Sequence, residues 1–503
     1  MDLGFLNNLI DGFIAAGSLN NLFFCLIGCM LGTLIGVLPG IGPIPTIAML
    51  LPVTYGLGPL TSLIMLAGIY YGAQYGGSTT SILVNMPGEA SSVVTCIDGH
   101  QMAKQGRAGA ALGVAALGSF FAGCVGTVFI AAFGPPLAAF AQKFSSPEYF
   151  ALMVLGLVTA VVMAHGSLVK AVAMILIGLL FGLIGTDVNT GVQRFTFGVE
   201  ELWDGMDFLP MVIGMFGIVE IIKNLEGPEV ARQAMSTRIR DLWPSLQDFK
   251  DSWKAVLRGT LSGSLLGIVP GGGVVLASFA AYTIEKKLAK DPSRFGKGAI
   301  EGVAGPESAN NAASQTSFIP LLTLGLPSNA IMALMMGAMM IQGIAPGSAV
   351  MQTRPDLFWG MVASMWIGNL MLVIINMPMI GLWVKLLSVP YRLLYPAIIM
   401  FCMIGIYSTS SSFVQIVLTA IFTGFGYLLL RLDCEPAPLI LGFILGPLME
   451  ENLRRSMVLS RGDPMIFFSR PISATLLVLA LIVVALIVLP QFRKTREVAF
   501  VED

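Results

Sequence analysis

Histidine and charged residues are scarce in this sequence. It contains two histidines, His100 and His165, among 503 residues, and they belong to no Cys-x-x-Cys or His-x-x-x-His pattern. A zinc site and a serine–histidine hydrolase are therefore not indicated. Charged residues make up 11% of the chain, less than half of the share of about 25% that is usual in soluble domains. The net charge of −1 offers no basic surface to a nucleic acid.

Cysteine carries no recognisable pattern either. The six cysteines are scattered, mostly within apolar runs, and no Cys-x-x-Cys pair occurs. Cys25 and Cys29 stand four residues apart on one helical face, and we expect buried thiols without chemistry there. A Walker A sequence is absent, so an ATP-driven process is not indicated. Motifs of intramembrane proteases are absent as well, and we expect no enzyme.

Apolar residues dominate what is present. They make up 55% of the chain, and the mean hydropathy is +0.82. Because a helix needs about 20 apolar residues to cross a bilayer, we expect an all-α polytopic membrane protein with about 12 transmembrane helices plus re-entrant or broken helices in two inverted-topology repeats. The expected spans lie near 19–38, 59–73, 108–133, 147–164, 167–185, 208–222, 256–270, 299–311, 357–383, 393–407, 413–431, 436–448 and 472–490, with short half helices at 43–54, 78–87, 274–284 and 314–343.

A glycine-rich break in an apolar segment occurs twice. The sequence GTLIGVLPGIGP covers 32–43, and GSLLGIVPGGGV covers 263–274. A run of small, hydroxyl and amide residues follows each break, GAQYGGSTTS at 72–81 and SANNAASQTS at 308–317. Two halves that each carry an interrupted hydrophobic segment are typical of secondary transporters whose site lies at the repeat interface.

The distribution of basic residues predicts the orientation of the two halves. The linker 223–258 contains seven Lys or Arg residues and is expected to be cytoplasmic. The turn 54–59 has no charge, whereas the corresponding loop 285–297 has five basic residues, so the halves are expected to face opposite sides. The acidic loop 186–207 then lies outside. Four basic residues fit this scheme poorly, because they would also be external: Arg454, Arg455, Arg461 and Arg470.

These patterns divide the chain into four parts. Residues 1–222 form the first inverted repeat with the first broken helix, and residues 223–258 form the basic cytoplasmic linker. Residues 259–450 form the second repeat with the second broken helix. Residues 451–503 supply a terminal loop, an extra transmembrane helix and a tail.

The two breaks predict an anion site. Pro39 and Pro270 interrupt the helical hydrogen bonds, and a broken helix in a bilayer needs partners for its freed backbone groups. The N–H groups at the start of each following helix carry a partial positive charge that suits a carboxylate. The alternative is that the glycines only allow close helix packing. The glycines expected to bind substrate are Gly40, Gly42, Gly271, Gly272 and Gly273.

Side chains of the two polar runs complete the expected site. Hydroxyls and amides are costly in a bilayer unless they are paired, so such a cluster predicts binding of a carboxylate or a cation. Hydrogen bonding between helices is the alternative. No Lys or Arg stands within the runs. The expected substrate-binding residues here are Ser78, Thr79, Thr80, Ser81, Asn85, Asn310, Asn311, Ser314 and Thr316.

Acidic residues next to the polar runs are candidates for coupling to Na⁺ or H⁺. An intramembrane carboxylate is a functional candidate by default. Glu89 follows Met86, Pro87 and Gly88, however, and a helix-capping role is an equal alternative for it. No ligand set for Na⁺ follows from the spacing. The residues expected to take part in coupling are Gly76, Gly77, Glu89, Glu307, Asn310 and Gln315.

Several long motifs resemble a known family. GVLPGIGP, GIYYGAQYGGSTTSILVNMPGEASSV, KQGRAGAALG, PGGG and GPESANNAASQTSFIPLLTLGLPS are similar to the large membrane subunit of tripartite tricarboxylate transporters, the TctA-like proteins. The resemblance implies a permease of the bacterial inner membrane. It also implies two partners, a small four-helix membrane subunit (TctB-like) and a periplasmic solute-binding protein (TctC-like) that selects the substrate. Citrate is then only the default substrate within a wider class of organic anions.

The expected function is symport of a citrate-like tricarboxylate or related organic anion with Na⁺ or H⁺. Both broken helices would form one site with alternating access, and no cofactor other than the coupling ion is expected. Neutralising a substrate carboxylate with a cation removes a desolvation cost of several kcal/mol, which gives coupling a physical basis. The alternative is a passive anion channel or a structural scaffold subunit of a membrane complex.

Overall fold

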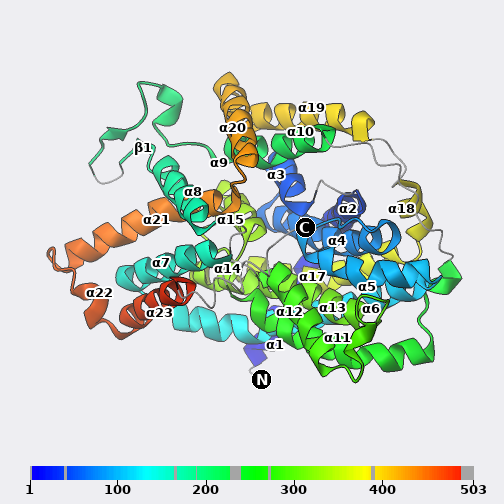
Figure 1. The fold of residues 1–503 in the computed structure, drawn as a ribbon. Coiled ribbons are helices and arrows are strands. Elements are labelled where there is room, and N and C mark those ends of the chain that lie inside the picture. Colours follow the sequence, from blue (N-terminus) through cyan, green and yellow to red (C-terminus); the bar gives the residue numbers. More distant parts are fainter. Residues whose placement is uncertain are drawn as a thin grey trace.

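The computed structural model describes residues 3–38, 42–163, 167–187, 190–226, 239–269, 273–386 and 391–488. Within these ranges the chain is almost entirely helical. The sheet in this part of the chain has two strands, β1 (Gly185–Thr186) and β2 (Gln193–Arg194), which pair antiparallel. Figure 1 shows this small hairpin projecting away from the helices.

The described residues of the first half of the chain form thirteen helical elements. They are α1 (Leu3–Ala16), α2 (Leu19–Val37), α3 (Pro43–Thr54), α4 (Pro59–Val84), η1 (Ala90–Ser92), α5 (Val93–Lys104), α6 (Ala108–Ala141), α7 (Ser146–Met163), α8 (Leu168–Gly182), η2 (Glu200–Leu202), α9 (Phe208–Val212), the π-helix η3 (Ile213–Ile218) and α10 (Val219–Glu226).

The second half supplies the remaining described helices. They are η4 (Ile239–Leu242), α11 (Leu246–Gly267), α12 (Gly273–Leu288), η5 (Pro292–Arg294), α13 (Glu301–Thr316), α14 (Phe318–Leu324), α15 (Ala330–Ile341), α16 (Ser348–Thr353), α17 (Pro355–Asn376), α18 (Ile380–Leu386), α19 (Tyr391–Ser410), α20 (Phe413–Arg431), α21 (Ala437–Leu459), α22 (Ile466–Ser469) and α23 (Pro471–Val488).

The helices confirm an all-α, multi-pass membrane protein. Five helical segments in the described part of the chain are long and apolar enough to cross a membrane. A bilayer offers no partners to backbone groups, and helices satisfy those groups internally. The five segments are Leu19–Val37, Ala108–Ala141, Phe208–Glu226, Pro355–Asn376 and Phe413–Arg431.

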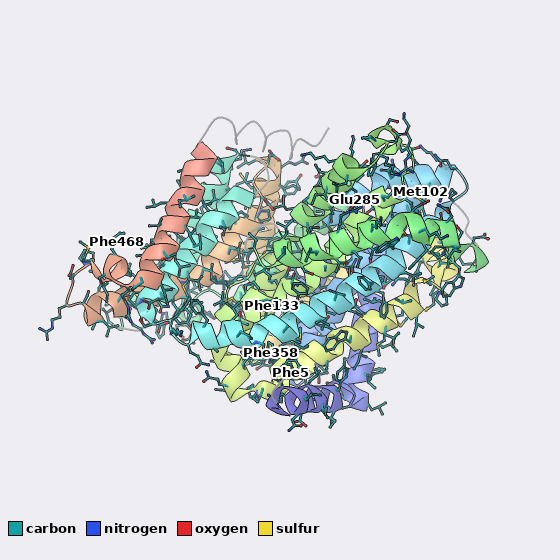
Figure 2. All side chains as sticks on the ribbon, turned by 90° about the horizontal axis from the view of Figure 1, so that it is seen from below. Phe5, Met102, Phe133, Glu285, Phe358 and Phe468 are labelled. Carbon is teal, nitrogen blue, oxygen red and sulfur yellow. The ribbon has the colours of Figure 1, made fainter. Side chains whose placement is uncertain are left out.

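Two groups of helices lie side by side. On one side of the molecule, α7 packs against α21 and α23, and on the other α2 packs against α4 and α11 against α13 (Figure 1). At the bottom of the second group α1 packs on α17, where the rings of Phe5 and Trp359 are 5.2 Å apart. Figure 2 labels Phe5 and the neighbouring Phe358 at this contact.

The helix α4 corrects one expectation. The polar run 72–81 was expected to separate a span at 59–73 from a half helix at 78–87, but the helix is continuous to Val84 and ends at Asn85. Glycines of α2 explain this continuity, because Gly32 and Gly36 lie directly against backbone atoms of Ile69 and Ala73 in α4. Two closely packed helices stabilise a glycine-rich stretch that would be weak in isolation.

The second polar run behaves in the same way. The sequence predicted that one helix ends near 311 and a second segment begins near 314, but α13 continues through this region to Thr316. Gly259 and Gly263 of α11 lie against backbone atoms of Gly305 and Ala309 in α13. The interruption comes later, at Gly325, between α14 and α15.

Two other boundaries differ from expectation because of local capping and packing. Helix α11 begins at Leu246, inside the expected linker 223–258, since Ser245 and Asp248 form a capping box. Helix α21 runs to Leu459, well beyond the expected end at 448, although Pro447 lies within it. Residues 227–238 of the linker lie outside the described residues.

Three of the four poorly fitting arginines have acidic partners in the structure. Arg454 pairs with Asp187 at 3.1 Å, Arg455 pairs with Glu451, and Arg470 pairs with Glu148 at 2.9 Å. The charges of these three arginines are therefore compensated within the chain.

Candidate functional site

A cavity of about 590 Å³ lies where four helical segments begin. Its walls include 42–45 at the start of α3, 88–90 at the start of η1, 274–276 in the first turn of α12, and 329–331 at the start of α15. The first N–H groups of a helix have no partners within the helix and carry partial positive charge. The starts of α3, α12 and α15 therefore bring positive helix ends to the cavity, although Pro43 and Pro45 leave Ile44 as the one N–H donor among the first three residues of α3, and Glu89 accepts the Ser91 N–H of η1.

Gly42 shows why the break before α3 needs glycine. Its φ is +65°, in the left-handed region, and it precedes Pro43 at the first helical position. A Cβ atom at Gly42 would meet nothing within 4 Å, so conformation rather than space selects glycine here. Gly273 begins α12. The other predicted glycines of the breaks, Gly40, Gly271 and Gly272, lie outside the described residues.

Glu89 and Asn329 occupy matching positions in the two halves. Each caps the helix that follows it, since Glu89 accepts the Ser91 N–H at 3.3 Å and Asn329 Oδ1 accepts the Met332 N–H at 2.9 Å. The sequences NMPGEA (85–90) and GLPSNA (325–330) share this arrangement. The sequence analysis did not single out Asn329, although the repeated Pro and Ala around it were a usable signal.

The carboxylate of Glu89 is held by neutral donors from three elements. Asn310 Nδ2 donates to Oε1 at 3.3 Å, and the Ser91 hydroxyl donates to the same oxygen. The Gln74 carboxamide, oriented with its nitrogen towards Glu89, lies 2.8 Å from Oε1. Gly77 leaves room for this arrangement, because a Cβ there would be 3.0 Å from Glu89 Cγ. The structure thus joins Glu89, Asn310 and Gly77, all predicted site residues.

Glu307 is a second, deeper carboxylate. It is 1% exposed and accepts hydrogen bonds from the hydroxyls of Ser78, at 2.5 Å, and Thr95. Among the described residues no Lys, Arg or His forms an ion pair with it. A buried carboxylate with only hydroxyl partners is costly when ionised and is suited to exchange a proton or a cation. Thr95, in α5, was not predicted.

A narrow crevice reaches Ser78, one of the two hydroxyl partners of Glu307. It has a volume of about 20 Å³, which is room for about one water molecule. Its polar lining comes from Tyr75, Ser78, Thr79, Ser119 and Asn376. The Tyr75 hydroxyl and Asn376 Oδ1 have no hydrogen-bond partner in the described part of the chain. A polar crevice of this size can hold the water that these atoms need.

Several predicted residues sit in packing contacts instead of the cavity wall. Thr80 Oγ1 donates to the carbonyls of Gly36 and Val37 at 3.1 Å each, and a Cβ on Gly76 would overlap the α2 backbone. Ser81 Oγ donates to the Ser92 carbonyl at 2.9 Å. These contacts hold α4 against α2 and η1. For these residues the structure therefore shows hydrogen bonding and packing between helices, which the sequence analysis gave as the alternative to substrate binding.

The predicted residues of α13 beyond Asn310 also face other helices. Asn311 Nδ2 donates to Ser119 Oγ at 2.7 Å, Ser314 and Thr316 donate to carbonyls of their own helix, and Gln315 is buried against Gly126 of α6. None of them belongs to the described cavity lining. Asn85 is an exposed left-handed cap of α4 and also lies outside it.

A basic residue lies near the site although the two polar runs contain no Lys or Arg. Lys223 of α10 lines the cavity, with its Nζ 3.8 Å from Glu220 Oε1 and its side chain 57% exposed. It is separated in sequence from both polar runs, so their composition did not reveal it. The π-helix η3 leads into α10 and contributes Met215 and Phe216 to the wall. Single π-turns are frequent at functional sites.

Comparison with known proteins finds one matching family and similar bacterial proteins. The family model described as the tripartite tricarboxylate transporter TctA family matches residues 22–441. The chain is 58% identical over 503 residues, 100% of both chains, to an Agrobacterium vitis protein described as an uncharacterized 52.8 kDa protein in the TAR-I ttuC' 3' region. A second A. vitis protein, described as lying in the TAR-II ttuC' 3' region, is 60% identical over 241 residues, 48% of this chain and 100% of its own length. No solved structure matches.

The family match covers every element that surrounds the cavity, from α2 to the start of α21. It includes both breaks, both polar runs and both capping residues, Glu89 and Asn329. The protein therefore belongs to the TctA family of tripartite tricarboxylate transporters, a family of transporter components and not of enzymes.

Proposed function

We propose that this chain is the permease subunit of a binding-protein-dependent secondary transporter that imports a tricarboxylate or related organic anion together with Na⁺ or H⁺. The observation that carries the proposal is the convergence of four helical starts on one cavity. Such ends attract anions. The protein would lie in the bacterial inner membrane with a TctB-like small subunit and a TctC-like periplasmic binding protein.

Two inverted repeats, 1–222 and 259–450, would build the central site. Reciprocal contacts support this division. Gln105 Nε2, after α5, donates to the Lys297 carbonyl at 2.8 Å in the α12–α13 connection. Gln342 Nε2, after α15, donates to the Thr54 carbonyl at 2.9 Å in the α3–α4 connection. A glutamine of each half thus donates a hydrogen bond to the corresponding turn of the other half. Such reciprocal contacts are expected when two repeats are related by a pseudo-twofold axis.

Coupling to a cation follows from the charges around the site. Glu89 borders the cavity and Glu307 lies behind it, so an incoming carboxylate meets negative charge as well as helix ends. Binding of Na⁺ or H⁺ near these two residues would offset that repulsion, and the two ligands would strengthen each other's binding. Lys223, at the exposed edge of the cavity, would attract the anion.

Uptake into proteoliposomes tests the proposal. The chain is reconstituted with its small subunit and binding protein, and radiolabelled citrate, malate and succinate are offered with and without an imposed Na⁺ or pH gradient. Concentrative uptake of at least one acid that needs a gradient is the expected result. Uptake that only equilibrates would show a passive channel, and the absence of any uptake would contradict a transport function for these acids.

A further inference from the structure

The two sides of the cavity are chemically different. Helix α3 packs against α15 on one side, and α12 packs against η1 on the other. The first side presents the neutral amide of Asn329, and the second presents the carboxylate of Glu89 at the matching position. A carboxylate is repelled by a like charge a few ångströms away in a medium of low dielectric constant. An organic anion is therefore repelled by Glu89 on the second side and meets no such repulsion from Asn329 on the first side.

The α3–α15 side also has an unused hydrogen-bond donor. Tyr70 lines the cavity and is 0% exposed, but no described residue forms a hydrogen bond with its hydroxyl. Ser317 and Asn329 are polar neighbours of this hydroxyl, although neither meets hydrogen-bond geometry. A buried hydroxyl without a partner costs about 1–3 kcal/mol. A ligand in the cavity would remove this cost.

We propose that the Tyr70 hydroxyl, the Ile44 N–H of α3 and the Ala330 and Ile331 N–H groups of α15 form a carboxylate subsite. It takes one carboxylate group of the transported anion, and the α12–η1 side with Glu89 does not. This inference rests on the proposed function, because it assumes that an organic anion enters the cavity. Tyr70 is then a determinant of the affinity for the carboxylate, in addition to the N–H groups at the helix ends.

Equilibrium binding to the purified full-length chain in nanodiscs tests the subsite. Radiolabelled citrate, malate and succinate serve as probes, and Tyr70→Phe is compared with wild type. Losing a hydrogen bond to a charged group lowers affinity about 10- to 100-fold, so a loss in this range is expected for every acid that wild type binds. The apo variant should melt at the wild-type temperature or above, since it loses only an unpartnered hydroxyl.

Tyr71→Phe is the matched control. Tyr71 is 1% exposed and its hydroxyl also lacks a partner among the described residues, but it does not line the cavity. Its removal should leave affinity unchanged. Wild-type affinity in Tyr70→Phe, or an equal loss in Tyr71→Phe, would overturn the subsite while the proposed function stands. Failure of the wild-type chain itself to bind any of the three acids would contradict both.

Discussion

The side-chain amide of Asn310 donates a 3.3 Å hydrogen bond to Glu89 Oε1, and this bond joins the two halves of the chain beside the cavity. Asn310 belongs to α13, and Glu89 caps η1 between α4 and α5. A neutral donor thus holds a carboxylate in the cavity wall without neutralising it. The Glu89 carboxyl group can still take up a proton or a cation.

Removing this donor should impair transport. We expect Asn310→Ala to lower the kcat/KM of uptake about 10-fold, because a lost hydrogen bond to a charged group costs about 1.5–3 kcal/mol. Proteoliposome uptake measures the effect. Asn452→Ala is the control and should transport normally, because the Asn452 amide donates to the Leu448 carbonyl of its own helix, α21. Normal uptake by Asn310→Ala would argue against a role for this contact.

Neutralising Glu307 should separate transport from its driving force. Glu307→Gln keeps the shape of the side chain and its hydroxyl neighbours Ser78 and Thr95, but it cannot change charge. We expect exchange of internal and external substrate to persist while accumulation driven by Na⁺ or pH gradients is lost.

The control for this variant is Glu301→Gln. Glu301 lies on the same helix but pairs with Arg294 at the protein surface. Its replacement should leave accumulation unchanged. Gradient-driven accumulation by Glu307→Gln at the wild-type level would exclude Glu307 from coupling.

Gly42→Ala should strain the start of α3. A non-glycine residue at φ +65° costs about 1–2 kcal/mol, although the space for a methyl group is free. We expect weaker citrate binding and a lower melting temperature in nanodiscs. Gly56→Ala adds a methyl group where nothing lies within 4 Å, and the φ of Gly56 lies outside the left-handed region, so this variant should behave as wild type. Equal behaviour of the two variants would refute the backbone argument.

The ion pair between Arg470 and Glu148 should stabilise the fold. Glu148 is almost fully buried, and Arg470→Met leaves its charge without this partner. Because Arg470 is half-exposed and Ser145 still donates to Glu148, we expect the loss of a hydrogen bond to a charged group, about 1.5–3 kcal/mol. The more exposed pair of Arg455 and Glu451 is the comparison, and Arg455→Met should cost less than about 1 kcal/mol. Unfolding by SDS titration measures both, and similar losses would contradict the assignment.

Local signals predicted the elements, and tertiary contacts set their ends. The span expected at 413–431 coincides with α20, because an apolar stretch of that length has one stable state in a bilayer. The sequence pattern predicted a helix end between 73 and 78 that does not occur there. The reason is the contact of Gly32 in α2 with Ile69 in α4, which joins residues far apart in the sequence and cannot be inferred from the residues of α4 alone. The end of α4 is at Asn85, where the backbone turns left-handed.

Some properties of this protein are local and can be read from the sequence alone: the length of the hydrophobic segments, the two proline–glycine breaks and the charges of the loops. From these properties the sequence by itself determined that the protein resides in a membrane and carries two interrupted segments. Only the tertiary structure decided which side chains meet. Glu89, Asn310, Asn329, Tyr70 and Lys223 come from different helices, and their proximity depends on how those helices pack. The physical reason is that a residue's type and spacing describe its own helix, whereas a site is formed between helices.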